Sequence, residues 1–197
     1  EDGSIDGSRR VLERLRSKYD QLRLVYHERN RGYGAALRSG FEAATSEWVF
    51  YTDGDGQYDV NDLHDLVPFT ENADVVNGQK ISRSDSWHRI WIGKVYAKVV
   101  GEVFELPIAD IDCDFRLIRT ALVKQLDLTA DSGAICVELI SGLDGLGARF
   151  EEVPVVHYSR QFGRSQFFQI RRIIRTLYQL NQIRSRLREG GRPDEHC

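Results

Sequence analysis

Several features that mark common protein classes are missing from this sequence. The 197 residues contain no methionine, and no apolar run reaches the length of about 20 residues that crosses a bilayer. There are three cysteines, Cys113, Cys136 and Cys197, and no CxxC or Cys/His zinc pattern. These absences argue against a membrane-spanning helix, a disulfide framework and a structural zinc site. We expect reduced, cytosolic thiols.

The sequence also lacks an excess of basic charge and a recognisable start. Its net charge is −3, so no global field favours nucleic acid as a partner. No signal peptide is visible, and the chain opens directly on the turn sequence Glu1-Asp2-Gly3-Ser4. We therefore expect a fragment of a longer protein, in which case a missing signal says little about the whole. The length suits one domain, or one domain with an appendage.

The hydrophobic pattern predicts alternating helices and strands. We expect helices over residues 11–19, 35–44, 61–69, 87–104, 134–146 and 166–188, and strands over residues 22–26, 48–52, 73–77, 115–118 and 149–156, the last broken by Pro154. This alternation predicts an α/β fold with a mostly parallel sheet flanked by helices. The chain divides into a domain over residues 1–165, a basic helix over residues 166–188 and a disordered tail over residues 189–197.

An acidic cluster follows the strand expected over residues 48–52, which reads as buried on both faces. Asp53, Asp55 and Gln57 alternate with glycines, and alternate side chains of an extended segment point the same way. In parallel sheets, ligands bind beyond the carboxyl ends of strands. Two carboxylates and an amide oxygen suit a hard cation, so we expect Mg²⁺ or Mn²⁺ here. The alternative is a solvated turn. An EF-hand is excluded, because its glycine and glutamate positions hold Tyr58 and His64.

A glycine-rich segment, Asn30-Arg31-Gly32-Tyr33-Gly34, lies between an expected strand and an expected helix. This arrangement favours phosphate binding at a helix N-terminus. It is not a dinucleotide fingerprint, because Leu37 stands where the third glycine belongs, and no Gly-Lys-Ser/Thr is present for a P-loop. A packing turn explains the segment by itself equally well.

Four blocks in a fixed order carry a resemblance to a known family. They are Glu1-Asp2-Gly3-Ser4-Ile5-Asp6-Gly7-Ser8, residues 30–40 (NRGYGAALRSG), residues 53–57 (DGDGQ) and residues 110–117 (DIDCDFRL). The later residues 152–155 (EVPV) and 160–165 (RQFGRS) also fit. These blocks resemble the family 2 glycosyltransferases of the GT-A fold, in particular the polyprenyl/dolichyl-phosphate sugar synthase branch. The match runs from Glu1 to Ser165.

The resemblance implies a Rossmann-like GT-A catalytic domain over residues 1–165, with its N-terminal strand missing, followed by an amphipathic helix. It assigns nucleotide-sugar binding to Asp2, Gly3, Asn30, Gly32, Gly34 and Asp53, and metal binding to Asp53, Asp55 and Gln57. It makes Asp55 and Arg116 catalytic, and it assigns an acceptor phosphate to Arg116, Arg160, Arg164 and Ser165. An arginine suits that task because its planar fork pairs with phosphate oxygens.

The sequence departs from the family at one further position. Asp114 stands where the family usually has glycine. An extra carboxylate near a phosphate site needs a cation or an arginine beside it, so we expect one there. Glu138, on an expected helix, is a weaker candidate for a catalytic carboxylate.

The helix expected over residues 166–188 is amphipathic and basic. Its apolar residues recur from Ile170 to Leu180, opposite Arg171, Arg172 and Arg175. Two interpretations stay open. The helix packs on the core with its arginines in water, or it lies in a membrane interface where the arginines meet lipid phosphates.

These features together predict an inverting hexosyltransferase that moves a sugar from a nucleotide-diphosphate sugar to a polyprenyl phosphate of the dolichyl or undecaprenyl type. Two alternatives remain: transfer to a saccharide or protein hydroxyl, and an inactive nucleotide-binding module. The expected partners are the nucleotide-sugar donor, the lipid-phosphate acceptor and a membrane surface, and not nucleic acid. We expect a cytoplasmic protein held peripherally at the cytoplasmic face of a membrane. The sugar and the base stay open.

Overall fold

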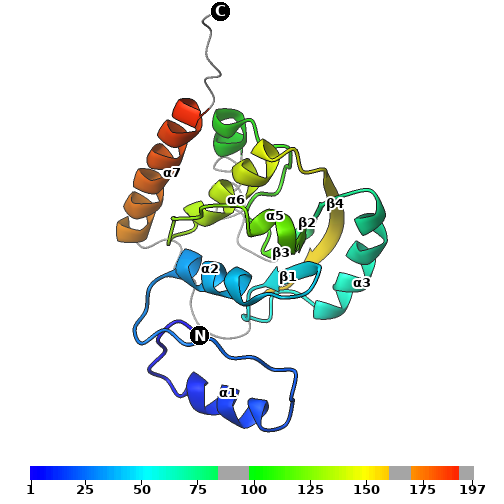
Figure 1. The fold of residues 1–197 in the computed structure, drawn as a ribbon, viewed down its shortest axis with the longest axis vertical. Coiled ribbons are helices and arrows are strands. Elements are labelled where there is room, and N and C mark those ends of the chain that lie inside the picture. The colour runs from blue at the N-terminus through cyan, green and yellow to red at the C-terminus, as the bar shows by residue number, and fades with distance from the viewer. Residues whose placement is uncertain (84–97, 160–169, 191–197) are drawn as a thin grey trace, which may run out of the picture.

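The computed structural model describes residues 1–83, 98–159 and 170–190. Figure 1 shows a sheet between two helical layers, with α7 set beside α6 and with α1 beyond α2. The helices are α1 Ser8–Arg16, α2 Tyr33–Ala43, α3 Leu63–Leu66, α5 Thr120–Val123, α6 Ala134–Gly145 and α7 Ile170–Gly190, and residues 98–104 are also helical. The strands are β1 Trp48–Thr52, β2 Val75–Arg83, β3 Phe115–Arg119 and β4 Phe150–His157. The α/β fold with flanking helices is confirmed.

The sheet of the described residues is mixed, which corrects the expectation of a mostly parallel sheet. Its order is β1-β3-β2-β4, with β3 antiparallel to both β1 and β2, and β4 parallel to β2. β1, β2 and β4 therefore run in one direction, as the alternation of strands and helices implied. β3 is inserted between β1 and β2 in the opposite direction, and a local hydrophobic pattern does not reveal such a pairing.

Successive residues of the strands point to opposite faces and build two cores. On one face, Phe115 and Leu117 of β3 pack with Leu66 of α3. On the other face, Ile118 packs with side chains of α2, α5 and α6, among them Phe41, Val123, Leu139 and Leu143. α6 is buried on nearly all sides because α7 covers it as well, through Leu180 and Ile183. The face that carries Ile118 is also the face toward which Arg116 points, because residues i and i+2 share a face.

Two expected elements differ in the structure. Residues 22–26 form no strand. Among the described residues, only Glu1 pairs with this segment in an extended arrangement. The Glu1 amino group donates to the Val25 carbonyl at 2.8 Å, and the Glu1 carbonyl accepts from the His27 N–H at 3.0 Å. One paired residue does not make a ladder. The helix expected over residues 61–69 is divided into α3 and a 3₁₀ turn on each side of it, and Pro68, which has no N–H to donate, lies in the turn that follows α3.

Two strands have the expected position but a different environment. β1 has the expected bounds, yet it lies at the edge of the described sheet, where Tyr51 is buried and the other residues are half-buried. β4 is not broken by Pro154, which pairs in register with Gln79. β4 is also an edge strand of this sheet, and an edge tolerates the missing proline N–H.

Other expectations concern the ends and the redox state of the chain. The described ranges contain no helix that combines the length and the apolar character needed to cross a bilayer. Cys113 and Cys136 are buried free thiols.

Residues 87–97 of an expected helix and residues 191–197 of the expected tail lie outside the described residues, while residues 189 and 190 belong to α7.

Candidate active site

The loop after β1 carries the expected metal ligands. Asp53 and Asp55 are partly exposed, and Gln57 is buried. Gly56 has a φ of 72° and allows the turn, in which Asp55 Oδ1 accepts from the Gln57 N–H at 3.1 Å. We call residues 53–57 the carboxylate loop.

Gln57 ties the carboxylate loop to the end of β4. Its Nε2 donates to the Tyr158 carbonyl at 3.0 Å, and its own carbonyl accepts from the Tyr158 N–H at 2.8 Å. This pair of hydrogen bonds gives Gln57 an anchoring role that its sequence position did not predict. It also brings Tyr158 next to the carboxylate loop.

Asp2 holds the glycine-rich segment by hydrogen bonds to its backbone. Its carboxylate accepts from the backbone N–H groups of Arg31 and Gly32, each at 2.8 Å, and lies 2.7 Å from His27 Nδ1. Partial burial acts to raise the pKa of Asp2, but the hydrogen bonds from His27, Arg31 and Gly32 outweigh it and lower that pKa. The carboxylate is therefore ionised at neutral pH. Asn30 Nδ2 donates to the Asp2 carbonyl at 3.1 Å, so the segment is clamped at two points.

Close backbone approaches require three of the glycines in this region. A Cβ on Gly3 would meet the backbone of residues 29 and 30, and a Cβ on Gly32 or Gly34 would meet the backbone of residues 130 and 131, all well under 3.0 Å. Gly3 and Gly32 also have positive φ angles, of 73° and 101°. The structure thus brings Asp2, Gly3, Asn30, Gly32 and Gly34 together at the N-terminus of α2.

Tyr33 links the glycine-rich segment to the carboxylates. Its hydroxyl donates to Asp114 Oδ1 at 2.6 Å. Burial raises the pKa of the Tyr33 hydroxyl well above its usual value, and the negative charges of Asp114 and Asp53 raise it further. The hydrogen bond therefore joins the start of α2 to the segment that leads into β3. The sequence offered a signal for Tyr33 only through its place between the two glycines.

Asp114 has the basic neighbours that its place in the sequence called for. Burial raises the pKa of the Asp114 carboxyl, while the Tyr33 hydrogen bond and the positive charges of Lys80 and Arg116 oppose the rise. Lys80 is itself anchored, since its Nζ lies 3.3 Å from Asp110 Oδ1 and donates to the Asp112 carbonyl at 2.6 Å. Sequence reasoning missed Lys80, which lies in the middle of β2 without a recognisable motif.

Arg116 is buried inside the sheet, where protein groups bind its guanidinium, and its phosphate contact stays a prediction. Its side chain has no exposed surface. Nε donates to Asn77 Oδ1 at 2.6 Å and Nη1 to Tyr51 Oη at 2.7 Å. Nη2 donates to the carbonyls of Ile111 and Cys113 at 3.1 and 3.3 Å. Tyr51 and Asn77 are the cross-strand partners of Arg116. The pairing of β3 with β1 and β2 therefore places the hydrogen-bond partners of the guanidinium beside it.

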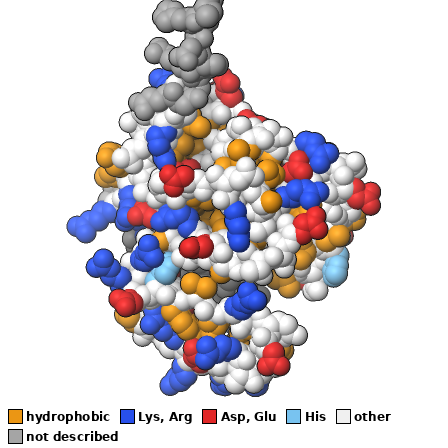
Figure 2. Space-filling model, in the orientation of Figure 1, with side chains coloured by type: hydrophobic (Ala, Val, Ile, Leu, Met, Phe, Trp, Pro, Cys, Tyr) orange, Lys and Arg blue, Asp and Glu red, His pale blue; other side chains and the backbone are white. Residues whose placement is uncertain are grey.

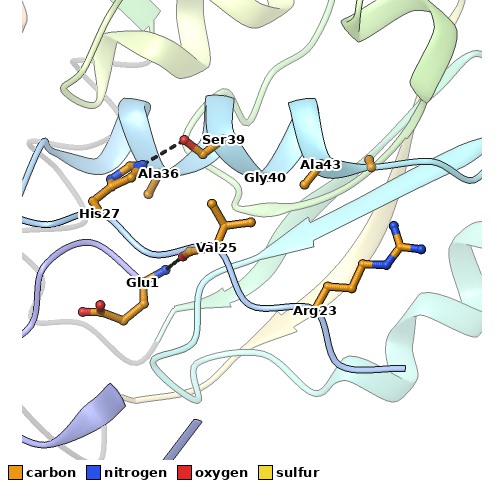
Figure 3. Close-up of a pocket in the computed structure, with 9 residues that line it drawn as sticks. Glu1, Arg23, Val25, His27, Ala36, Ser39, Gly40 and Ala43 are labelled. Carbon is orange, nitrogen blue, oxygen red and sulfur yellow. Dashed lines mark hydrogen bonds between the residues drawn. The ribbon is translucent and has the colours of Figure 1, made fainter. Parts of the chain in front are cut away.

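Two cavities accompany these groups. Figure 3 shows one of about 300 Å³ between residues 23–27 and α2, where His27 Nε2 lies 2.8 Å from Ser39 Oγ. The lining of this cavity includes His27 and neither Asp53 nor Asp55, so the cavity is separate from the carboxylate loop. A second hollow, of about 470 Å³, lies beside the carboxylate loop and is lined by Gly56, Tyr58 and Tyr158, among others. The second hollow therefore touches the carboxylate loop at Gly56, and its lining does not include Asp53, Asp55 or Gln57.

The comparison with known families agrees with this geometry. Residues 1–127, which include the Asp2 clamp, the glycine-rich segment and the carboxylate loop, match Glycosyl transferase family 2. The chain belongs to glycosyltransferase family 2.

Solved structures of glycosyltransferases share the GT-A-like fold of this family 2 chain. Mannosyl-3-phosphoglycerate synthase from Rubrobacter xylanophilus is 16% identical, with a TM-score of 0.55 over 84% of this chain and 54% of that one. Glucosyl-3-phosphoglycerate synthase from Mycobacterium tuberculosis, in complex with Mn²⁺, UDP-glucose and phosphoglyceric acid, is 13% identical, with a TM-score of 0.57 over 98% and 68%. S. aureus TarS is 18% identical, with a TM-score of 0.51 over 79% and 49%. This chain thus spans about half to two thirds of the length of these proteins.

The expected metal ligands of the glycosyltransferase chain have oxygen atoms that suit a divalent cation, but they are few. No group of three or more His, Cys, Asp and Glu side chains within residues 1–83, 98–159 and 170–190 is arranged to hold a metal. The expected set of Asp53, Asp55 and Gln57 contains two carboxylates, and such a set leaves coordination positions for donor phosphates and water, as Mg²⁺ prefers. The chemistry of these partly exposed carboxylates fits the ion, while the amide nitrogen of Gln57 already donates to Tyr158.

The other residues expected in the acceptor site follow β4 in the sequence. Arg160, Arg164 and Ser165 lie outside the described residues. Glu138 is described, and it makes structural contacts: its carboxylate accepts from the N–H groups of Thr129 and Ala130 at 3.0 and 2.8 Å.

Proposed function

We propose that the protein transfers a sugar from a nucleotide-diphosphate sugar to a lipid phosphate, with inversion at the anomeric carbon. The observation that carries this proposal is the pair of hydrogen bonds between Gln57 and Tyr158. It sets the carboxylate loop next to the chain segment that leads into Arg160. A donor diphosphate and an acceptor phosphate would then meet at one hollow of the surface.

On the donor side, Asp53 and Asp55 would hold Mg²⁺ or Mn²⁺ against the donor diphosphate. A bound dication offsets the negative charge that develops on a departing nucleoside diphosphate. Asp2 keeps the glycine-rich segment in place by accepting from the Arg31 and Gly32 N–H groups, and the positive dipole at the N-terminus of α2 would favour a phosphate nearby. The hydrogen bond from Tyr33 to Asp114 ties that helix end to the segment that leads into β3.

On the acceptor side, a phosphomonoester needs positive charge more than it needs a general base. Its second pKa lies near 6, so at pH 7 it is already largely a dianionic nucleophile. Arg160, Arg164 and Ser165 follow the described end of β4 and would dock it. The names of the phosphoglycerate synthases above support an acceptor that carries a phosphate.

The face of α7 favours a lipid rather than a small acceptor. Ile174, Leu177 and Tyr178 are 61%, 56% and 63% exposed. In Figure 2 basic and hydrophobic side chains lie side by side over the region of α7, and Arg171 and Arg172 are exposed there. A surface that combines apolar and cationic side chains suits the interface of an anionic membrane. We therefore place the protein at the cytoplasmic face of a membrane in this proposal.

Vesicle binding and transfer test the acceptor assignment together. With Mn²⁺ and labelled nucleotide sugars, we expect label to enter vesicles that contain undecaprenyl phosphate, and not 3-phosphoglycerate or a free saccharide. Replacing both Arg171 and Arg172 by Gln removes about 1 kcal/mol of attraction per charge, so binding to anionic vesicles falls roughly 30-fold.

A matched loss of charge elsewhere provides the control. Arg10→Gln with Lys18→Gln, on and just after α1, should leave vesicle binding unchanged. Label that enters phosphoglycerate or a saccharide hydroxyl, with no vesicle binding, would replace the lipid acceptor by a soluble one. Nucleotide binding without transfer to any acceptor would favour the inactive module.

A further inference from the structure

The segment Thr129–Ser132, which we call the 129–132 loop, supports the glycine-rich segment directly. The Gly34 N–H donates to the Asp131 carbonyl at 3.1 Å. Arg38 of α2 donates to the Ala130 carbonyl. A Cβ at Gly32 or Gly34 would collide with these same two carbonyls, so the two backbones are in van der Waals contact. Any shift of the 129–132 loop must therefore move the start of α2.

α6 holds the first half of this loop through Glu138. The carboxylate of Glu138 accepts from the N–H groups of Thr129 and Ala130, and from Thr129 Oγ1 at 3.0 Å. Arg186 of α7 pairs with the same carboxylate, with Nη2 2.6 Å from Glu138 Oε1. The side chain of Glu138 is only 8% exposed, so these bonds are largely shielded from water.

α7 holds the second half of the loop through Gln179. Gln179 Oε1 accepts from Ser132 Oγ at 2.6 Å and from the Ser132 N–H at 3.2 Å, and Nε2 donates to Asp131 Oδ1 at 2.7 Å. A carboxamide supplies a donor and an acceptor at one position, which neither a carboxylate nor an ammonium does. Arg175 pairs with Asp131 as well. α7 is thus attached to the loop by polar contacts and to α6 by its apolar side chains Leu180 and Ile183.

We infer that Gln179 is a positioning residue for the donor nucleotide, acting through the 129–132 loop on the backbone of Gly32 and Gly34. This inference rests on the proposed function, in which the glycine-rich segment lies beside the donor nucleotide. A binding site keeps its geometry only when the residues behind it are themselves held. The helix expected to meet a membrane would accordingly also be part of the support of the donor site.

Nucleotide binding to the purified protein, with Mn²⁺ and either UDP or GDP, tests this role by calorimetric titration. We expect Gln179→Ala to raise the Kd about tenfold, as loss of a supporting contact commonly does, while the melting temperature without nucleotide changes little. Gln179→Glu should bind at least as weakly, because its carboxylate faces that of Asp131. Adding Asp131→Asn to Gln179→Glu reverses donor and acceptor, and it should restore the Kd to within about threefold of wild type.

The same helix offers the matched control. Gln182 lies one turn further, where its Nε2 donates to Tyr178 Oη at 3.1 Å on the exposed side, so Gln182→Ala should bind as wild type does. Equal Kd values for wild type and Gln179→Ala would overturn the positioning role while the proposed function stands. A failed rescue by the double variant would also contradict it. A wild-type protein that binds neither nucleotide would overturn the proposed function itself.

Discussion

Replacing Arg116 by Met is expected to lower the free energy of unfolding by about 3–5 kcal/mol, the cost of breaking a buried charged network by removal of one partner. The substitution leaves Asn77 Oδ1 and Tyr51 Oη without their donor inside the sheet. It also removes a positive charge beside Asp114, whose burial already opposes ionisation. Urea denaturation at pH 7 measures the effect as a lower midpoint.

Arg119 provides a control in the same strand. Its side chain is 34% exposed and pairs with Asp74 and Glu47 at 3.0 and 2.9 Å. Arg119→Met should therefore cost about 1 kcal/mol or less, as exposed ion pairs do. If both variants unfolded at the same urea concentration as the wild type, the structural role assigned to Arg116 would be wrong. Arg116 would then be available for a ligand after all.

Gly34→Ala is expected to destabilise the protein by about 1–3 kcal/mol, the range for forcing an extra methyl group into a packed site. The new Cβ would overlap the Ala130 carbonyl, which belongs to backbone and cannot rotate away. The start of α2 or the 129–132 loop must move, so nucleotide affinity should fall together with stability. Thermal unfolding with and without nucleotide reports both effects.

Gly40 of the same helix separates this clash from helix propensity. A Cβ at Gly40 meets no atom within 4 Å. Gly40→Ala should stabilise the protein by up to about 1 kcal/mol, because alanine favours a helix interior over glycine. A Gly34→Ala variant that gained stability in the same way would show that the close approach between the two backbones is not needed.

The local parts of the site could be predicted because local chemistry determines them. The apolar run of β1 ends at Asp53, and the bounds of β1 agree with the sequence pattern. The glycines at residues 32 and 34 were recognisable because only glycine allows the backbone approaches found there. The need for a cation beside Asp114 followed from the expectation of an extra carboxylate near a phosphate site.

The parts that failed depend on partners distant in the sequence. The burial of Arg116 could not be predicted, because an arginine in a motif carries no sign of the direction in which its side chain points. Its burial comes from Tyr51 and Asn77, which lie on two other strands. The insertion of β3 between β1 and β2 is likewise a matter of pairing, and so is the absence of a ladder at residues 22–26. Gln179 and Lys80 belong to no motif, and only their contacts reveal them.

Calorimetric titration of UDP and GDP into the purified protein, with Mn²⁺ and then with a chelator, tests the central claim most directly. We expect one nucleotide to bind only with the metal, and Asp53→Asn or Asp55→Asn to weaken binding by about 100-fold or more, as loss of a metal ligand implies. Asp65→Asn, at an exposed aspartate of α3 outside the lining of the second hollow, should bind as wild type does. Binding that survives both the chelator and the two substitutions would contradict the claim.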